Sequence, residues 1–383
     1  MNSTSVPEIS AEDLAKAIEA GDRIQVVDLR SPSKVAGGKI ELVPAEDFHN
    51  IPGSSLLSLH SLAGVRLDLH GPTVAVCAHG NDSKIVAAHL NGLGARVRSL
   101  TGGMASWMMV SRPRPLPTPP SLDHLVQFDR VGKGALSYVL ISAGEAMIVD
   151  PARDPHPYLK CIEVANARLV AVADTHVHAD YISGAGHLAG QFHVPYFLHP
   201  ADAIYPYDET RGRLDFRPLA DGTHIPLGTC LIEVVHTPGH SPGSVTFLID
   251  WKAALTGDFL FISSVGRPDL AAKTEAWAAL LWKSIQRAKK EWPPDLMIYP
   301  AHYSTQAERQ ADRTIGAPLA ELFRRNGSLG KATQSEFLDW VRQKESSFPE
   351  AYRKIKAINV GLSDVSDQEA DELEFGKNEC SIG

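Results

Sequence analysis

Short apolar runs and helix-like stretches alternate through the first hundred residues of the chain. Residues 24–30 and 73–77 are runs rich in β-branched side chains, a pattern that favours strands. Residues 10–13 form a capping-box pattern at the start of a helix expected at residues 11–20. The run at 73–77 leads through a tight turn into a helix expected from residue 83. Strand, tight loop and helix in this order predict a small α/β domain.

The middle of the chain, from about residue 122 to 315, carries many short apolar runs divided by Gly, Pro and His. The runs expected to be strands are residues 136–149, 169–172, 230–235, 245–249 and 296–298. Residues 274–290 are expected to form a helix. This mixture predicts an α/β fold with layered sheets. After residue 316 the chain is expected to be mostly helical, and the acidic residues 363–383 are expected to be loosely ordered.

Five prolines lie among residues 111–121, between these two regions. Proline cannot continue a helix or a central strand, and a run of prolines favours a stiff, extended segment. We therefore predict a linker at residues 113–121. It divides a first domain, residues 1–112, from a second, residues 122–315, which is followed by a C-terminal helical extension and acidic tail, residues 316–383. A length of 383 residues suits two or more domains.

Composition and charge exclude several classes of partner. The chain has 37 Lys and Arg against 45 Asp and Glu, a formal net charge of −8, which disfavours nucleic-acid binding. No apolar run approaches the roughly 18 residues that a membrane helix needs. Because no basic region followed by an apolar one opens the chain, we expect no secretory signal. These observations predict a cytoplasmic protein without nucleic-acid or membrane partners, and they leave open whether it is a homodimer.

The cysteines and histidines are distributed differently. The four cysteines, Cys77, Cys161, Cys230 and Cys380, form no CxxC pair, which argues against a disulfide scaffold or a thiolate zinc site and suits a reducing compartment. Except for Cys77, discussed below, we expect them to be structural or incidental. Of 16 histidines, nine lie between residues 176 and 302, where we expect metal chemistry.

Four loops in this region place His or Asp just after an apolar run. They are THVHADY (residues 175–181), HTPGHSPG (236–243), TGDFL (256–260) and YPAHY (299–303). A single HxH pair is a weak signal, because surface histidines fall at that spacing by chance. Four such loops in order are specific, and imidazole with carboxylate suits iron or zinc without any thiolate.

The ordered motifs THVHAD, PGHSPG, TGDFLF with GRPDL, and YPAH resemble the metallo-β-lactamase fold over about residues 122–315. Within that superfamily they resemble the persulfide dioxygenases, or sulfur dioxygenases. The resemblance implies a four-layer αββα sandwich that oxidises glutathione persulfide with O2 to sulfite and glutathione. It also implies one Fe(II) per chain, with zinc as the alternative, on His176, His240 and Asp258. Such a triad leaves metal positions open for substrate and O2.

The same resemblance implies roles for nearby residues. His178 would be an additional ligand or would orient the site. In two-metal relatives, Asp180, a histidine after it and the equivalent of His302 hold a second metal, but here Tyr181 replaces that histidine. The second site is therefore expected to be vestigial, which weighs against hydrolases that activate water between two zinc ions.

Three side chains are candidates for substrate binding: Arg267, Tyr181 and Tyr303. A guanidinium group suits a substrate carboxylate, so Arg267 is the best candidate. The alternative for Arg267 is an internal salt bridge with Asp269.

Residues 1–112 resemble a rhodanese domain through VDLR (27–30), HNIPGS (49–54), GGMASW (102–107) and the loop that begins at Cys77. The loop residues are Cys77, Ala78, His79, Gly80, Asn81, Asp82 and Ser83. The N-terminus of the following helix would stabilise a thiolate or persulfide at Cys77. Asp82 stands where the family often has arginine, and its charge opposes anionic donors such as thiosulfate. The alternative is that Cys77 is an inert core residue.

The leading hypothesis is thus a two-domain enzyme. The second domain oxidises glutathione persulfide, and the first transfers sulfur among persulfide, sulfite and thiosulfate through Cys77. One alternative is a metal-dependent thioester hydrolase of the hydroxyacylglutathione hydrolase type. Another is a persulfide-binding protein without catalytic activity.

Overall fold

The structure is a computed structural model that describes residues 6–63, 67–271 and 273–382. The first five residues, where we expected no secretory signal, lie outside this part. The chain divides into two compact units. The first unit ends at Ser111 and also takes in residues 130–133 and 375–377, and the second comprises the rest. The division after Ser111 lies beside the boundary predicted at residue 112.

The first unit is built around a five-stranded sheet in which all neighbouring strands are parallel. Its strands, in spatial order, are β1 (Glu8–Ile9), β5 (Val97–Leu100), β4 (Thr73–Val76), β2 (Gln25–Asp28) and β3 (Phe48–Asn50). Its helices are α1 (Ala11–Glu19), α2 (Pro32–Ala36), α3 (Gly53–Leu57), α4 (Asn81–Gly92) and α5 (Gly103–Met109). Strands β2 and β4 lie within the two apolar runs, and the α/β class is confirmed.

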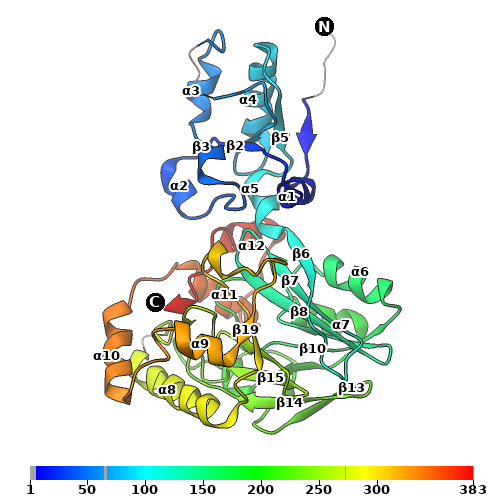
Figure 1. The fold of residues 1–383 in the computed structure, drawn as a ribbon, viewed down its shortest axis with the longest axis vertical. Helices are drawn as coiled ribbons and strands as arrows, with labels where there is room; N and C mark the ends of the chain where they lie inside the picture. Colours follow the sequence, from blue (N-terminus) through cyan, green and yellow to red (C-terminus); the bar gives the residue numbers. More distant parts are fainter. Residues whose placement is uncertain (1–5, 64–66, 272, 383) are drawn as a thin grey trace. The chain divides into compact units, whose positions relative to one another are not determined.

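Two larger sheets form the centre of the second unit (Figure 1). The seven-stranded sheet contains, in spatial order, β12 (Arg217–Pro218), β11 (Tyr196–Leu198), β10 (Arg168–Ala173), β9 (Glu145–Val149), β8 (Ala135–Ser142), β7 (His124–Arg130) and β6 (Ser111–Pro115). The six-stranded sheet contains β13 (His224–Leu227), β14 (Cys230–His236), β15 (Val245–Ile249), β16 (Ala253–Gly257), β18 (Met297–Pro300) and β19 (Ala317–Pro318). A short pair of strands, β17 (Val265–Gly266) and β20 (Ser381–Ile382), joins the end of the chain to the segment after β16.

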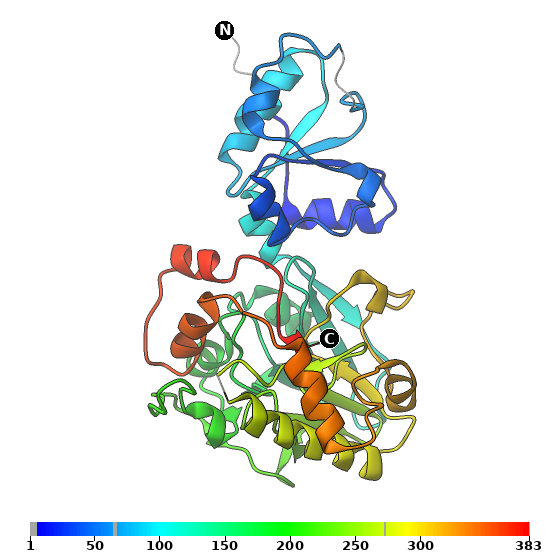
Figure 2. The same ribbon diagram turned by 90° about the vertical axis from the view of Figure 1, so that its left-hand side faces the viewer.

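Apolar side chains fill the space between the two sheets and cover both outer faces. Leu140, Val149, Phe247 and Leu255 belong to the core between the sheets. Helices α6 (His156–Val164) and α7 (Ala185–Phe192) pack on the outer face of the seven-stranded sheet. Helices α8 (Thr274–Glu291), α9 (Leu319–Arg325) and α10 (Gln334–Lys344) pack on the other outer face, and Figure 2 shows α10 beside α8. This arrangement confirms the predicted αββα sandwich.

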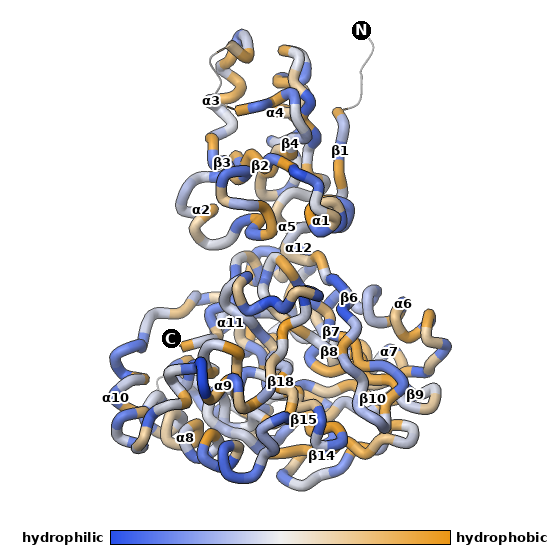
Figure 3. The backbone as a smooth tube through the Cα atoms, viewed as in Figure 1, coloured by the Kyte–Doolittle hydropathy of each residue, from blue (hydrophilic) through white to orange (hydrophobic). Residues whose placement is uncertain are grey.

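Hydropathy along the backbone explains these layers. Figure 3 marks strands such as β8 and β15 as apolar stretches, as expected for strands buried on both faces. Helix α8 instead buries one stripe that includes Trp277, Leu281, Ile285 and Ala288, at the spacing of a helix face. Within the described ranges, no helix combines the length and the apolar character needed to cross a membrane.

Two predicted segments differ from the structure. The first residues of the predicted proline-rich linker belong to strand β6. This strand lies at the edge of the seven-stranded sheet, where proline is tolerated although it has no backbone N–H group to donate. The acidic tail, expected to be loosely ordered, contains helix α12 (Asp367–Leu373) and strand β20. Cys380 and Ile382 of the tail are buried, so apolar contacts and strand pairing hold this segment in place.

Candidate metal centre

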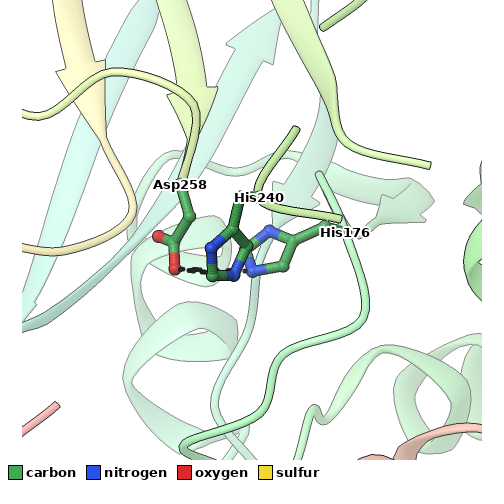
Figure 4. Close-up of side chains that lie close together, drawn as sticks. All are labelled: His176, His240 and Asp258. Carbon is green, nitrogen blue, oxygen red and sulfur yellow. Dashed lines mark ion pairs between the residues drawn. The ribbon is translucent and has the colours of Figure 1, made fainter. Parts of the chain in front are cut away.

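Three loops that follow strands bring His176, His240 and Asp258 together (Figure 4). His176 follows β10, His240 lies between β14 and β15, and Asp258 directly follows β16. The Nε2 atoms of His240 and His176 lie 3.4 and 3.6 Å from Oδ2 of Asp258. The structure thus gathers the three predicted ligands, which are far apart in sequence, at one point.

The atoms that face one another in this triad are buried and have no hydrogen-bond partner among the described residues. They are Nε2 of His176, Nε2 of His240 and Oδ2 of Asp258. The other polar atoms of two of these side chains have partners. Nδ1 of His240 lies 3.0 Å from the carbonyl oxygen of Arg267, and Oδ1 of Asp258 lies 2.7 Å from Nδ1 of His302. Buried polar atoms are almost always paired, so three that converge without partners fit the ligands of a metal ion.

The electrostatics of the triad also suit a cation. Burial lowers the pKa of His240 to about 4, although Asp258 acts in the opposite direction, and it lowers the pKa of His176 well below the usual value. Burial raises the pKa of Asp258, but the neighbouring His302 outweighs it, and the net pKa is lowered. Neutral imidazoles and an ionised carboxylate are the states that a metal ion requires.

His178, predicted as an additional ligand or an orienting group, is anchored at one end of its ring. Its Nε2 lies 3.1 Å from Oδ1 of Asp150 and 2.8 Å from the hydroxyl of Tyr181. Its Nδ1 is buried and makes no hydrogen bond within the described part of the chain, so this is the atom through which His178 could contact a metal. The Tyr181 hydroxyl donates to the carbonyl oxygen of Asp150 at 3.1 Å. Because the same hydroxyl contacts His178, Tyr181 helps to fix the orientation of the His178 ring.

Asp150 orients the site, and sequence reasoning missed it. It follows β9 with a positive φ of 54°, and its Oδ1 accepts the backbone N–H of Thr175 at 2.7 Å. The Thr175 hydroxyl lies 3.0 Å from Nδ1 of His176, so Asp150 fixes His178 directly and His176 through Thr175. The signal was present, because an apolar run followed by an aspartate is the same pattern that pointed to Asp258.

Asp202, also missed, joins the two histidine loops. It lies in the short helix η2 (Pro200–Ala203) and is buried. Its Oδ2 accepts the N–H of Val177 and the hydroxyl of Ser241, both at 2.8 Å, and its Oδ1 accepts the N–H of Gly243 at 2.7 Å. Nothing in the surrounding sequence distinguishes Asp202 from a surface residue, so only the structure identifies it.

Asp180 and His302, predicted as remnants of a second metal site, lie together. Nε2 of His302 is 3.0 Å from Oδ2 of Asp180. The structure adds Cys380, which we expected to be incidental: the ligand atoms of the three side chains all lie within 4.8 Å of one another. Burial lowers the pKa of His302, but Asp180 and Asp258 outweigh it and raise this pKa to about 10. Cys380 belongs to no motif, so no signal in the sequence could have placed it here.

The two other candidates for substrate binding have buried protein partners. Nε and Nη2 of Arg267 donate to the two carboxylate oxygens of Asp269 at 2.7 and 2.6 Å, which is the internal salt bridge given as the alternative. The Tyr303 hydroxyl donates to Oδ1 of Asp129 at 3.1 Å and also contacts Arg309. Substrate contact by either side chain stays a prediction.

A cavity of about 360 Å³ lies beside the two histidine loops. Its lining includes Val177 and Ser241, which are chain neighbours of two ligands of the triad, together with Lys273, Trp277 and Lys356. Lys356 lies on α11 (Ala351–Asn359), and its Nζ donates to the carbonyl oxygen of Val177 at 3.0 Å. Burial lowers the pKa of Lys356, with Asp202 acting in the opposite direction. The cavity therefore offers two lysine side chains within a mainly apolar lining beside the two histidine loops.

In the first unit, the loop that begins at Cys77 wraps around the sulfur atom. The Cys77 Sγ accepts the N–H of Gly80 at 3.1 Å and the N–H of Ser83 at 3.4 Å, at the start of α4. Gly103 packs against this turn with φ of +60°, and a Cβ there would lie 2.5 Å from the Cys77 carbonyl oxygen. Among the remaining loop residues, Ala78 is half-buried, and His79, Asn81 and Asp82 are exposed.

Comparison with known proteins identifies both units. Residues 131–322 match the metallo-beta-lactamase superfamily, and residues 10–109 match the rhodanese-like domain. The first match includes the triad and most strands of the two larger sheets, and the second includes the Cys77 loop and four of the five strands of the parallel sheet.

Individual relatives and a solved structure are similar to parts of this chain. The human protein named persulfide dioxygenase ETHE1, mitochondrial, is 33% identical over 160 residues, which is 41% of this chain and 59% of that protein. A hydroxyacylglutathione hydrolase of Acidiphilium cryptum is 31% identical over 220 residues, 52% of this chain and 88% of the relative. The crystal structure of a metallo-beta-lactamase from Staphylococcus aureus superposes with a TM-score of 0.53 at 25% identity, covering 61% of this chain and 71% of that one.

Proposed function

The chain belongs to the metallo-beta-lactamase superfamily and carries a rhodanese-like domain ahead of that fold, and on this basis we propose that it is a persulfide dioxygenase. One glutathione persulfide, one O2 and one water would yield one glutathione and one sulfite. The convergence of three buried ligand atoms without protein partners in the described structure, on His176, His240 and Asp258, supports this proposal most strongly. Similarity to the human persulfide dioxygenase supports the choice of substrate.

The triad would hold one Fe(II) per chain, and His178 would be an additional ligand through Nδ1, which makes no hydrogen bond within the described part of the chain. An iron ion bound by the two imidazoles and the carboxylate of the triad would supply the redox chemistry with substrate and O2. The chain's own contribution is orientation, because Asp150 fixes His178, and Asp202 joins the loops that carry the two histidines of the triad.

The cavity lined by Val177, Ser241 and Lys356 is the proposed binding place for the glutathione moiety. Its position beside both histidine loops would direct the persulfide sulfur toward the triad. Lys356 would bind a carboxylate of glutathione, because ammonium groups bind carboxylates by charge-assisted hydrogen bonds. Lys273, whose Nζ donates to Glu209 at 2.9 Å, would be a second contact.

The rhodanese-like domain is proposed to move sulfane sulfur through Cys77. The backbone N–H groups of Gly80 and Ser83 donate to the Cys77 sulfur and would hold a bound sulfane sulfur within the loop. Transfer from a Cys77 persulfide to sulfite would form thiosulfate and regenerate the Cys77 thiolate, so the two units would act on the same pool of sulfur compounds.

The test is metal analysis of protein purified without oxygen, combined with O2 uptake on glutathione persulfide. We expect about one iron per chain and sulfite formation in equal amount to O2 consumed. His176→Ala should lose both iron and uptake, whereas His187→Ala, a change on the exposed face of α7, should retain both. Iron-loaded protein that consumes no O2 with this substrate would contradict the proposal.

A second candidate is a two-metal thioester hydrolase of the hydroxyacylglutathione hydrolase type. The group of Asp180, His302 and Cys380 favours it, because hydrolases of this type need a second metal beside the first. The match to the Acidiphilium relative also spans most of that protein. Absence of iron from the purified protein, and cleavage of a glutathione thioester at the same rate with and without O2, would favour the hydrolase over the dioxygenase.

A further inference from the structure

We propose that Asp180, His302 and Cys380 form a second metal site, in which the C-terminal tail of this chain supplies a thiolate ligand. This inference is independent of the reaction proposed above, because it concerns binding of a cation by three side chains. It differs from the two-histidine arrangement expected of a second site, since the position after Asp180 is occupied here by Tyr181.

The three donors are close and buried. Their ligand atoms all lie within 4.8 Å of one another, and Nε2 of His302 is 3.0 Å from Oδ2 of Asp180. None of the three side chains exposes more than about one hundredth of its surface. Ligand atoms around one metal ion are separated by similar distances, because each lies about 2.0 to 2.3 Å from the ion. Small side-chain movements would therefore complete the site.

The tail is fastened so that Cys380 points into this group. Strand β20 pairs with β17, directly after Cys380, and the Cys380 carbonyl oxygen accepts the N–H of Arg267 at 2.9 Å. On the other side, the N–H of Glu379 donates to the hydroxyl of Tyr352 at 2.7 Å. The sulfur is thus delivered by an ordered backbone, and the arrangement does not depend on a mobile chain end.

Tyr181 does not compete with Cys380 for the place beside Asp180 and His302. Its hydroxyl is directed to Asp150 and to Nε2 of His178. The third donor beside Asp180 and His302 is therefore the cysteine of the tail. A residue lost from the linear motif is replaced by a donor from the far end of the sequence.

The donor set points to a particular class of ion. Sulfur, imidazole nitrogen and carboxylate oxygen together suit Zn²⁺ or a similar divalent transition metal, and disfavour Mg²⁺ or Ca²⁺. Binding would release the thiol proton of Cys380 and the proton on Nε2 of His302. The site would adjoin the first, because Nδ1 of His302 also contacts Oδ1 of Asp258 at 2.7 Å.

The test uses the full chain, stripped of metal and titrated with Co²⁺ alone under reducing conditions without oxygen. A thiolate bound to Co²⁺ gives a sulfur-to-cobalt charge-transfer band in the near ultraviolet, which imidazole and carboxylate ligands do not give. We expect two Co²⁺ per chain and this band in the wild type. Cys380→Ser should bind one Co²⁺ without the band, whereas Cys230→Ser, a change at another buried cysteine, should match the wild type.

Two further variants separate this inference from the triad. His240→Ala should lose the first Co²⁺ and keep the charge-transfer band. Asp180→Asn should weaken the second Co²⁺ at least tenfold with Cys380 intact, so the conclusion does not depend on folding of the cysteine variant. A wild type without the band, or a band that persists in Cys380→Ser, would overturn the second site and leave the iron and O2-uptake experiment to be judged separately.

Discussion

The carboxylate of Asp202 offers a sharp test of how the candidate metal centre is held in shape. Asp202 contacts no ligand side chain of the triad, yet it accepts three hydrogen bonds from the two histidine loops. Two come from the N–H groups of Val177 and Gly243, and one comes from the hydroxyl of Ser241. Asp202→Asn keeps the size of the side chain and replaces one acceptor oxygen with a donor group.

The expected cost follows from this geometry. An asparagine can turn its oxygen to Val177 and Ser241, but its amide then faces the N–H of Gly243, which leaves two donors opposed. A hydrogen bond to a charged group contributes about 1.5–3 kcal/mol, so we expect a loss of about 3 kcal/mol of unfolding free energy. In a unit of this size, that corresponds to a fall in Tm of roughly 6–12 °C.

Metal affinity should fall as well, because the loops that carry His176 and His240 lose their shared anchor. Residues that orient metal ligands typically change metal affinity by about 10- to 100-fold when they are replaced. The assay is competition with a chelator of known affinity at a temperature where the variant is fully folded, together with thermal unfolding of the metal-free protein. Asp208→Asn, a change at an exposed aspartate, is the control and should leave both quantities unchanged. Wild-type metal affinity in a folded Asp202→Asn protein would refute the reasoning.

Three further changes have clear expected outcomes. Asp269→Asn breaks a buried pair with an arginine and should cost about 3–5 kcal/mol of unfolding free energy in urea denaturation, whereas Asp295→Asn, at an exposed pair, should cost under about 1 kcal/mol. Burial and the stacked imidazole of His236 lower the pKa of His199 in the folded protein, so the stability that neutral His199 contributes is lost as the pH falls below about 6.5. Between pH 8 and pH 5, the unfolding free energy of His199→Asn should therefore fall less than that of the wild type. The control His187→Asn should fall as much as the wild type. Asp82→Arg should lower the KM for thiosulfate in a thiosulfate-to-cyanide sulfur-transfer assay, most strongly at low salt, and an unchanged KM would show that this exposed charge does not control donor choice.

The features that the sequence predicted are those encoded within a few neighbouring residues. Each ligand of the triad follows an apolar run, and buried strands that end at the same edge of a sandwich bring such loops together. The Cys77 loop was predictable for the same reason, since a strand, a tight turn and a helix are contiguous in the chain. The proline-rich segment shows the limit of this reasoning, because the edge of a sheet tolerates proline where its interior does not.

The features that could not be predicted depend on contacts between distant parts of the chain. Asp202 has no recognisable motif, and its role exists only because three donors from two other loops converge on it. Arg267 belongs to a motif that suggested substrate binding, and Asp269 binds Nε and Nη2 along one edge of its guanidinium group. In each case the chemistry of the side chain was evident from the sequence, and its partner was not.

At the proposed second metal site, the motif lacks a histidine because Tyr181 follows Asp180, and Cys380 of the tail would supply the third ligand. With tyrosine at position 181, the motif offers no imidazole after Asp180, yet the fold brings the thiol of Cys380 close to the Asp180 carboxylate. A thiolate adds a negative charge where the imidazole was neutral, so a second cation there would be held more strongly and would favour softer metals. Because the thiol is carried by a tail that pairs with the segment after Asp258, metal binding at the second position would also stabilise that pairing. Changes in the tail, far from every motif, should therefore alter the properties of the metal centre.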